Sequence, residues 1–455
     1  MNTGSDGKRT YRITTLGCKV NQYESNYISK TLEMNGLRKA GGAERADICV
    51  INTCIVTQRA SRQSRQAIRK LIRENPGSTV AAAGCYAQVF PDELKKIDGL
   101  KIIAGNTSKG ELPRLLLDDP PPEGRVLLLE DFEKDMPFEF LEPVDFPERT
   151  RAYLKIQDGC RSFCSYCIVP FARGPLRSLP PAGVLDMMKR LAEAGYREVV
   201  LTGIHLGKYG VDLGEDLDLS GLLKMIAGEN MPVRVRISSI EPNEVGDELI
   251  EMMAGEQWLC RHFHISLQNG DDRILKRMKR GYDSRDFARL VEKIKRKIPL
   301  AAIGIDIMSG FPGEDHIAHT NTVRLLEKLP VSYLHVFPFS PRPGTKAFSF
   351  EGRVLPEIIK ERAMELRMLG EKKRGTFYGK CLEREFVVLA ERRHPRMNRF
   401  MSGRSDNYLA VNFVSSDDLS GELIGVRLKE VQKDGIRGEM SSKGAGVRCR
   451  SELLR

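Results

Sequence analysis

The chain has 455 residues, and its 72 lysine and arginine residues outnumber its 61 aspartate and glutamate residues, which gives a net charge of +11. This length suffices for two or three domains with separate cores, and the positive charge favours a polyanionic partner. No apolar run reaches the length of a membrane span, so we expect no membrane segment. The first seven residues are polar and lack the apolar core of a secretory signal. Ten cysteines in such a chain indicate ligands in a reducing compartment, and we expect a cytoplasmic protein.

The first predicted domain, residues 9–120, alternates strands with helices. Strands are expected at residues 12–16, 48–51 and 79–83, followed by helices at 22–35, 58–74 and 91–97. This alternation predicts a doubly wound parallel sheet. Cys18, Cys54 and Cys85 each follow the end of a strand, and the carboxyl ends of parallel strands share one edge of a sheet. Any one of them alone would be interpreted as a buried thiol, but their shared position predicts a metal site. Cys49 lies within its strand and is expected in the core.

The helix expected at 58–74 carries a stripe of arginines on one arc of a 3.6-residue period. Its members are Arg59, Arg62, Arg65, Arg69 and Arg73. Such a stripe could bind phosphate groups through bidentate contacts. A solvated helix face is the ordinary alternative, and the pattern does not separate the two. Residues 121–148 are acidic and contain prolines, and they are expected to be a linker.

Three cysteines then occur within eight residues, with the spacing C-x3-C-x2-C. They are Cys160, Cys164 and Cys167. Thiols at this spacing can point at one centre, and zinc or an iron–sulfur cluster is the usual occupant. A structural zinc site needs four ligands, and no second C-x2-C pair follows in this chain. Three sulfurs on a four-iron cluster leave one iron open for a small ligand. Three unrelated core thiols are the alternative, although cysteines usually pack singly.

The second predicted domain covers residues 149–375 and repeats a strand–helix unit six times. Strands are expected at 153–156, 198–201, 234–237, 263–267, 303–307 and 333–337, with helices between them at 181–194, 244–254 and 283–296 among others. This pattern predicts a partial (β/α)6 barrel whose chemistry lies at the carboxyl ends of its strands. His205, His262 and His264 could be ligands, but satisfied core or rim histidines are the expected interpretation, and Cys260 is expected to pack.

The third predicted domain, residues 376–445, is a small antiparallel β-barrel followed by a tail at 446–455. Strands are expected at 382–390, 407–414 and 423–431. Basic residues are interleaved with aromatic ones, namely Arg392, Arg393, Arg396, Arg399 and Arg404 with Phe400 and Tyr408. This mixture suits RNA through phosphate contacts and base stacking, and a merely solvated basic surface is the alternative. Cys381 and Cys449 are expected to be structural.

Several motifs in order resemble the methylthiotransferases of the radical S-adenosylmethionine (radical SAM) enzymes. These motifs begin at Leu16, Asn52, Gly84, Cys160, Arg236 and Gly310, and the resemblance covers about residues 10–445. The stretch Leu16-Gly17-Cys18-Lys19-Val20-Asn21-Gln22-Tyr23-Glu24 resembles the branch acting on N6-threonylcarbamoyladenosine (t6A) of tRNA. The resemblance implies methylthiolation of C2 of t6A at position 37, in the anticodon stem-loop. It also implies that the tail domain is a TRAM module.

The resemblance further implies two [4Fe-4S] clusters and SAM as cofactors. Cys160, Cys164 and Cys167 would hold the cluster that binds SAM, with Tyr166 near its adenine, and Cys18, Cys54 and Cys85 would hold the second cluster. A reductase or flavodoxin-type electron donor and a sulfur source would be needed. Strand-end position makes five further residues candidates for holding SAM, namely Thr202, Arg236, Ser238, Gln268 and Asp306. Asn269 stands where the family usually has serine, which should matter little if Gln268 makes the contact.

Three alternatives remain open. The first is the same chemistry on isopentenyladenosine-37 of tRNA or on a ribosomal protein. The second is a non-catalytic, metal-dependent RNA-binding protein, which would hold zinc and be colourless. The third is a radical SAM enzyme with a single cluster, such as a methylase.

Overall fold

The structure is a computed structural model that describes residues 8–118, 124–142, 149–214, 216–394 and 397–442. The chain forms two compact units. The first comprises Met1–Asp145, Gln157–Arg177 and Ser340–Phe348, and the second comprises Phe146–Ile156, Ser178–Phe339 and Ser349–Arg455. The segment with the three clustered cysteines therefore belongs to the unit that contains the N-terminal sheet, whereas the sequence-based domains assign it to the central one.

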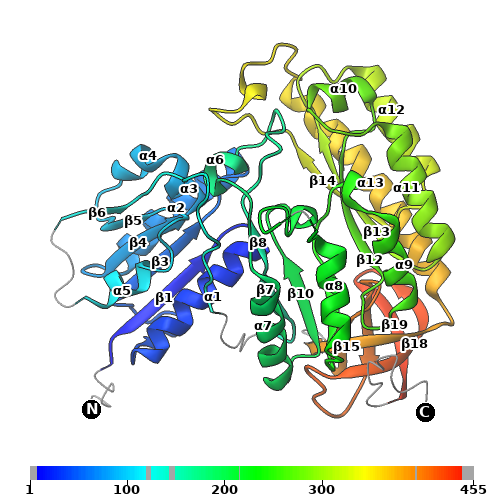
Figure 1. Cartoon of the computed structure of the whole chain (residues 1–455), viewed down its shortest axis with the longest axis horizontal. Helices are drawn as coiled ribbons and strands as arrows, with labels where there is room; N and C mark the ends of the chain where they lie inside the picture. The colour runs from blue at the N-terminus through cyan, green and yellow to red at the C-terminus, as the bar shows by residue number, and fades with distance from the viewer. Residues whose placement is uncertain (1–7, 119–123, 143–148, 215, 395–396, 443–455) are drawn as a thin grey trace. The chain divides into compact units, whose positions relative to one another are not determined.

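The first unit is built on a parallel sheet with the strand order β2-β1-β3-β4-β5-β6 (Figure 1). Its strands are β1 (Thr10–Thr15), β2 (Arg38–Lys39), β3 (Ile48–Thr53), β4 (Thr79–Gly84), β5 (Ile102–Ala104) and β6 (Val126–Leu128). Its helices are α1 (Lys19–Met34), α2 (Gln58–Glu74), α3 (Cys85–Val89), α4 (Pro91–Lys95) and α5 (Leu112–Leu117). The doubly wound parallel sheet is confirmed. The strands β2, β5 and β6 were not predicted, and β6 lies within the expected linker.

Two apolar cores, one on either side of the sheet, hold the first unit together. One contains Ile51 and Tyr86, and the other contains Val50 and Ile28 from α1. Because successive residues of a strand point to opposite faces, the fully buried β3 contributes to both cores. The segment after the clustered cysteines forms α6 (Val169–Arg173), and its Ala172 packs in the core that contains Tyr86.

The second unit contains six parallel barrel strands, in two groups of three (Figure 1). The strands are β7 (Ala152–Lys155), β10 (Glu198–Thr202), β11 (Arg234–Ile237), β12 (His262–Gln268), β13 (Ala302–Ser309) and β14 (Tyr333–Pro338). A bridge between Ile240 and Ile265 connects the two groups. The main helices between them are α7 (Pro181–Glu193), α8 (Leu219–Gly228), α9 (Asp247–Gly255), α10 (Asp272–Arg277), α11 (Ser284–Lys297) and α12 (His316–Lys328). All six predicted strands are present, and the partial (β/α)6 barrel is confirmed.

Short elements complete the two units. They are β8 (Gln157–Asp158), β9 (Arg177–Ser178), and the 3-10 turns η1 (Leu206–Lys208), η2 (Pro242–Glu244) and η3 (Lys346–Ser349).

The end of the chain forms a closed five-stranded barrel in the order β15-β16-β17-β19-β18. Its strands are β15 (Glu385–His394), β16 (Met397–Ser405), β17 (Ala410–Val414), β18 (Leu423–Gln432) and β19 (Gly435–Ser442), and only the β17–β19 pair is parallel. This confirms the small β-barrel, although β16 and β19 were not predicted. The helix α13 (Pro356–Cys381) crosses the predicted boundary at 375, and its Cys381 is buried in the barrel core. Cys449 lies outside the described residues.

Candidate active site

Three cysteines of the first unit follow three neighbouring strands. Cys18 comes after β1 and caps α1, Cys54 follows β3 directly, and Cys85 follows β4 as the first residue of α3. Because β1, β3 and β4 are adjacent in the sheet, the three residues lie at one edge. Gly17 has φ +101°, and a Cβ there would lie 2.9 Å from the Cys54 Sγ. A glycine therefore permits the close approach of the Cys18 turn to Cys54.

The electrostatics of Cys54 show how closely the thiols are grouped. Burial, together with the smaller effect of the charges of Cys85 and Cys18, raises the pKa of this thiol to about 11. Thiolates do not share so small a space without a compensating cation, whereas a bound metal deprotonates its thiol ligands outright. The chemistry of this donor set therefore fits a metal cluster.

A buried arginine from the neighbourhood of the other cysteine motif contacts the same edge. Arg173, the last residue of α6, donates from Nε to the Cys85 Sγ at 3.3 Å and from Nη2 to the Asn21 Oδ1 at 2.6 Å. Its Nη1 pairs with Glu24, which also pairs with Lys109, and all four of these charged or amide side chains are buried. The sequence analysis missed this network. The sequence signal that could have found it is an arginine six residues after Cys167, at the end of an otherwise apolar run.

The three clustered cysteines lie in a tightly folded loop and are all half-buried. The Cys167 N–H donates to the Cys164 carbonyl at 2.9 Å, and the Cys160 N–H donates to the Gly174 carbonyl at 3.0 Å. Gly159 has φ +75°, and a Cβ there would lie 1.6 Å from the Pro175 carbonyl oxygen. Only glycine fits at that point, so the loop conformation that presents the thiols is built into the sequence. Tyr166 is half-buried within this loop.

Three of the predicted SAM contacts lie at carboxyl ends of barrel strands. Thr202 is the last residue of β10, Ser238 follows β11, and Gln268 is the last residue of β12. Gln268 has φ +68°, which is strained for a side chain with a Cβ, and its buried Oε1 has no hydrogen-bond partner among the described residues. A strained residue with an unpaired buried acceptor is the pattern expected of a ligand contact. The contact between Gln268 and SAM stays a prediction.

Arg236 occupies a different environment from the one expected. Its guanidinium is buried, pairs with Glu198 and donates to the carbonyls of Ser405 and Asp406 at 3.0 and 2.9 Å. Arg234 likewise pairs with Glu198 and donates to carbonyls of the C-terminal barrel. A contact between Arg236 and SAM would have to break these bonds. The role that the structure shows for this pair is to join β11 to the C-terminal barrel.

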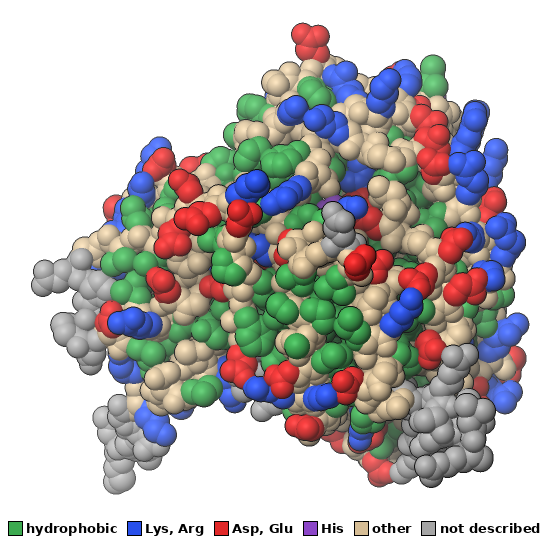
Figure 2. All heavy atoms as spheres, viewed as in Figure 1, with side chains coloured by type: hydrophobic (Ala, Val, Ile, Leu, Met, Phe, Trp, Pro, Cys, Tyr) green, Lys and Arg blue, Asp and Glu red, His purple; other side chains and the backbone are tan. Residues whose placement is uncertain are grey.

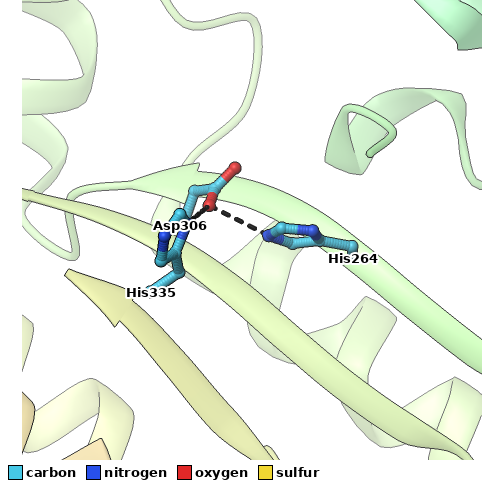
Figure 3. A group of neighbouring side chains, drawn as sticks. All are labelled: His264, Asp306 and His335. Carbon is cyan, nitrogen blue, oxygen red and sulfur yellow. Dashed lines mark hydrogen bonds and ion pairs between the residues drawn. The ribbon is translucent and has the colours of Figure 1, made fainter. Parts of the chain in front are cut away.

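Asp306 lies within β13 and not at its end, because the strand runs three residues beyond it, to Ser309. Its Oδ1 lies 2.9 Å from the His264 Nε2 on β12 and 3.0 Å from the His335 Nδ1 on β14 (Figure 3). The sequence analysis did not single out His335. The Nε2 of His205 lies 2.7 Å from Glu244, and the Nε2 of His262 lies 2.8 Å from the Tyr333 hydroxyl, which is consistent with the expected core or rim histidines.

The predicted RNA surface of the C-terminal barrel divides into two parts. Tyr408 stacks on His262 with ring centroids 4.4 Å apart, and the Arg404 guanidinium lies over Tyr408, so both face the (β/α)6 barrel. Arg392 and Arg399 are exposed. Of the remaining residues, Arg393 is also exposed and binds the carbonyls of Ser415 and Ser416, Phe400 lies near Arg437, and Arg396 is outside the described side chains.

The arginine stripe on α2 is mostly solvent-facing. Arg59, Arg62, Arg69 and Arg73 are exposed, whereas Arg65 pairs with Glu93 at 2.8 Å. Both earlier interpretations of the stripe stay open. On the face drawn in Figure 2, basic and acidic side chains are interspersed and do not form one basic field. None of the described helices combines the length and apolar composition that crossing a membrane requires.

Comparison with known proteins gives two family matches. Residues 10–105 match an uncharacterized protein family, UPF0004, and residues 154–326 match the Radical SAM superfamily. The chain is 36% identical to the threonylcarbamoyladenosine tRNA methylthiotransferase MtaB of Bacillus subtilis, over 92% of this chain and 93% of that protein. It is 35% identical to the MtaB of Thermotoga maritima, over 98% of each chain.

Two further comparisons concern a relative that is named for another tRNA substrate and a solved structure of low sequence identity. The tRNA-2-methylthio-N(6)-dimethylallyladenosine synthase of Dictyoglomus thermophilum is also 35% identical, over 94% of this chain and 98% of that protein. Among solved structures, the radical SAM methyltransferase TsrM from Kitasatospora setae superposes with a TM-score of 0.56 at 16% identity, covering 75% of this chain and 77% of that one. That likeness concerns the fold alone.

The identity to curated relatives extends over nearly the whole chain, and the superfamily match spans both the C-x3-C-x2-C segment and most of the barrel strands. The cofactors of this superfamily are SAM and a [4Fe-4S] cluster, as the sequence predicted. The chain belongs to the radical SAM methylthiotransferase family, and it is an enzyme of the transferase class.

Proposed function

We propose that this enzyme methylthiolates C2 of N6-threonylcarbamoyladenosine at position 37 of tRNA, in the anticodon stem-loop. The product would be 2-methylthio-N6-threonylcarbamoyladenosine. The observation that carries the proposal is the presence of two cysteine triplets in one compact unit, in a chain whose relatives from several organisms are named for this reaction. The t6A branch rests on those names and on the motif that begins at Leu16.

Two clusters follow from this proposal. Cys160, Cys164 and Cys167 would hold a [4Fe-4S] cluster with one iron open for SAM, and Cys18, Cys54 and Cys85 would hold the second. When bound, these groups supply the radical that removes hydrogen from C2 and the sulfur that replaces it. Radical chemistry is needed because C2 of adenine is an unactivated carbon that acid–base catalysis does not reach.

The chain's own residues would orient the cosubstrate and the base. Tyr166, Thr202, Ser238 and Gln268 are the proposed SAM contacts. Among the described residues the Oε1 of Gln268 has no hydrogen-bond partner, which favours such a contact. The base must leave its stack to react, as in other enzymes that act on bases. A surface around Arg392 and Arg399 on the C-terminal barrel would hold RNA phosphates, as a TRAM module would. An electron donor of the reductase or flavodoxin type and a sulfur source complete the reaction, which we place in the cytoplasm with its tRNA substrate.

Mass spectrometry of tRNA nucleosides tests the proposal. A strain that lacks the gene should accumulate t6A and lose 2-methylthio-t6A, and the parent gene should restore the product. A gene carrying Cys164→Ala should not restore it. If the strain instead loses a methylthiolated isopentenyladenosine, the enzyme acts on isopentenyladenosine-37 and belongs to the other tRNA branch. If the tRNA nucleosides are unchanged, the proposed tRNA substrate is wrong, and a ribosomal protein becomes the acceptor to test.

A further inference from the structure

A cluster of polar side chains lies on one face of the strands β12, β13 and β14, and aliphatic side chains occupy the other face. His264, Asp306 and His335 come from these three adjacent strands, and Asp306 is the direct register partner of His335 (Figure 3). The aliphatic neighbours along the strands, such as Ile265 and Ile305, are fully buried on the opposite face. His335 stands three residues before Pro338, the last residue of β14, which places the cluster about 10 Å below the carboxyl end of the strand.

Asp306 organises the cluster. Its Oδ1 accepts from both imidazoles, and Ser266 Oγ lies 3.4 Å from Oδ2. Burial raises the pKa of this carboxyl, but the hydrogen bonds from His264 and His335 outweigh burial and hold the pKa well below its usual value. The same hydrogen bond raises the pKa of His335. Asp306 is therefore a fixed anion that orients two imidazoles and favours the charged form of His335.

The imidazoles of His264 and His335 differ in how many of their ring nitrogens have a hydrogen-bond partner among the described residues. His264 is 19% exposed, and its Nδ1 lies 3.3 Å from the Ser239 Oγ, so both of its nitrogens are engaged. His335 is 71% exposed, and among the described residues no hydrogen-bond partner meets its Nε2. His262 and His205, by contrast, are buried. His335 thus presents one oriented ring nitrogen to a ligand.

The two tRNA branches of the family act on adenosines with different N6 substituents, threonylcarbamoyl or isopentenyl. The His335 Nε2 can form hydrogen bonds with the first of these and not with the second. A threonylcarbamoyl group carries a carboxylate and a hydroxyl, both of which an imidazole or imidazolium can bind. An isopentenyl group would remove water from His335 and Asp306 without replacing the hydrogen bonds, which is costly. Sites built to hydrogen-bond a substrate reject analogues that lack the partner group far more strongly than apolar pockets reject polar ones.

We propose that the cluster of His264, Asp306 and His335 binds the threonylcarbamoyl side chain of the substrate and makes the enzyme specific for t6A, with His335 as the contacting residue. This inference rests on the proposed function and assigns its specificity to named side chains. Asp306 and His264 are positioning residues here, because they act through His335. An N6 substituent points away from the reacting C2, so a cluster below the strand ends can hold it while the base stays near the rim.

Binding of three anticodon stem-loop RNAs that differ only at base 37 tests the inference. They carry adenosine, isopentenyladenosine or t6A, and their dissociation constants are measured by fluorescence anisotropy with the full chain, reconstituted without oxygen. We expect the parent to bind the t6A RNA most tightly. His335→Phe should remove about 10- to 100-fold of that preference, the value of a hydrogen bond to a charged group, and leave the adenosine RNA unaffected. His335→Gln should retain part of the preference, and Asp306→Asn should lose it as His335→Phe does.

His319→Gln is the matched control, since His319 lies on α12 and pairs with Glu365 at 2.7 Å. It should keep the parent preference. A parent that does not prefer t6A would overturn the proposed substrate itself. A parent that prefers t6A together with a His335→Phe variant that keeps the full preference would overturn this inference alone. The three ligand atoms lie within 4.8 Å of one another. A stoichiometric divalent ion other than iron, released on Asp306→Asn, would therefore make the cluster a metal site and also overturn the inference.

Discussion

The Arg173 Nε lies 3.3 Å from the Cys85 Sγ, so a side chain from α6, just after the C-x3-C-x2-C motif, contacts a cysteine of the other triplet. Arg173 is fully buried and is held in place by Asn21 and Glu24. The hydrogen bond from the guanidinium fixes the direction of the Cys85 sulfur. A side chain from the segment that follows one cysteine triplet therefore contacts a cysteine of the other.

Arg173→Gln should impair assembly of the cluster on Cys18, Cys54 and Cys85. The variant removes a buried cation that contacts both Cys85 and Glu24, and the ion pair between Glu24 and Lys109 stays. Iron and acid-labile sulfide per reconstituted chain should fall to about half of the parent value, while the other four-iron cluster remains. Arg69→Gln, an exposed arginine of α2, serves as the control and should keep the parent iron content.

Cys164→Ala should abolish the reductive cleavage of SAM. Two thiolates hold a four-iron cluster poorly, and the open iron that binds SAM is lost with it. Chromatography should detect no 5′-deoxyadenosine after reduction with dithionite under anaerobic conditions. Production at the parent rate would contradict the assignment of this motif.

Cys54→Ala should separate SAM cleavage from sulfur transfer. Cys54 follows β3 and is grouped with Cys18 and Cys85, so its loss leaves Cys160, Cys164 and Cys167 intact. We expect 5′-deoxyadenosine without methylthiolated tRNA, measured on the same reaction mixture. If methylthiolated nucleoside still forms at the parent rate, the first triplet consists of packing residues.

Glu198→Gln should destabilise the second unit. Although burial alone would raise its pKa, Arg236 and Arg234 hold the pKa of Glu198 well below the ordinary value of 4.5. Removing the carboxylate leaves two buried guanidiniums uncompensated, at a cost of about 3–5 kcal/mol in the free energy of unfolding.

The same pair gives a pH dependence that chemical denaturation can follow. Because the folded pKa of Glu198 is lowered, its contribution is complete above the ordinary pKa and is lost as the pH falls below it. The variant should lack this acid-induced loss. Glu248→Gln, which removes an exposed ion pair with Lys224, should leave the melting temperature unchanged.

Substitution of two exposed arginines in the C-terminal barrel should weaken tRNA binding and reduce its salt dependence. Deleting the barrel is the cruder test, because deletion would also expose Arg234 and Arg236, which donate to its carbonyls. In the double variant Arg392→Gln, Arg399→Gln, the slope of log K against log salt should fall by about 0.7–0.9 for each phosphate that the protein no longer binds. Arg285→Gln on α11 is the control, and an unchanged slope in the double variant would exclude this surface.

The regular parts of the fold could be predicted because their signals are local. Each barrel strand is a short apolar run between a helical pattern and a polar strand end, and all six were found, as were β1, β3 and β4. The short strands β2, β5 and β6 have two or three residues, too few for a pattern, and exist because a neighbouring strand provides hydrogen-bond partners. The longer strands β16 and β19 each pair with two neighbours in the closed barrel, and their local sequence does not record these pairings.

The cysteine spacing and the strand-end positions were determined by the sequence alone, because both depend on residues close together in the chain. Which buried charge faces which partner was decided only by the tertiary structure. Arg236 was expected to contact SAM because it lies near the end of a strand, yet it binds Glu198 and carbonyls some 170 residues away in the chain. The sequence analysis did not select His335 as a candidate. Its proposed role follows from the strands β12, β13 and β14, which place His264 and Asp306 beside it. Such pairings are set by strand order and register, and no local pattern records them.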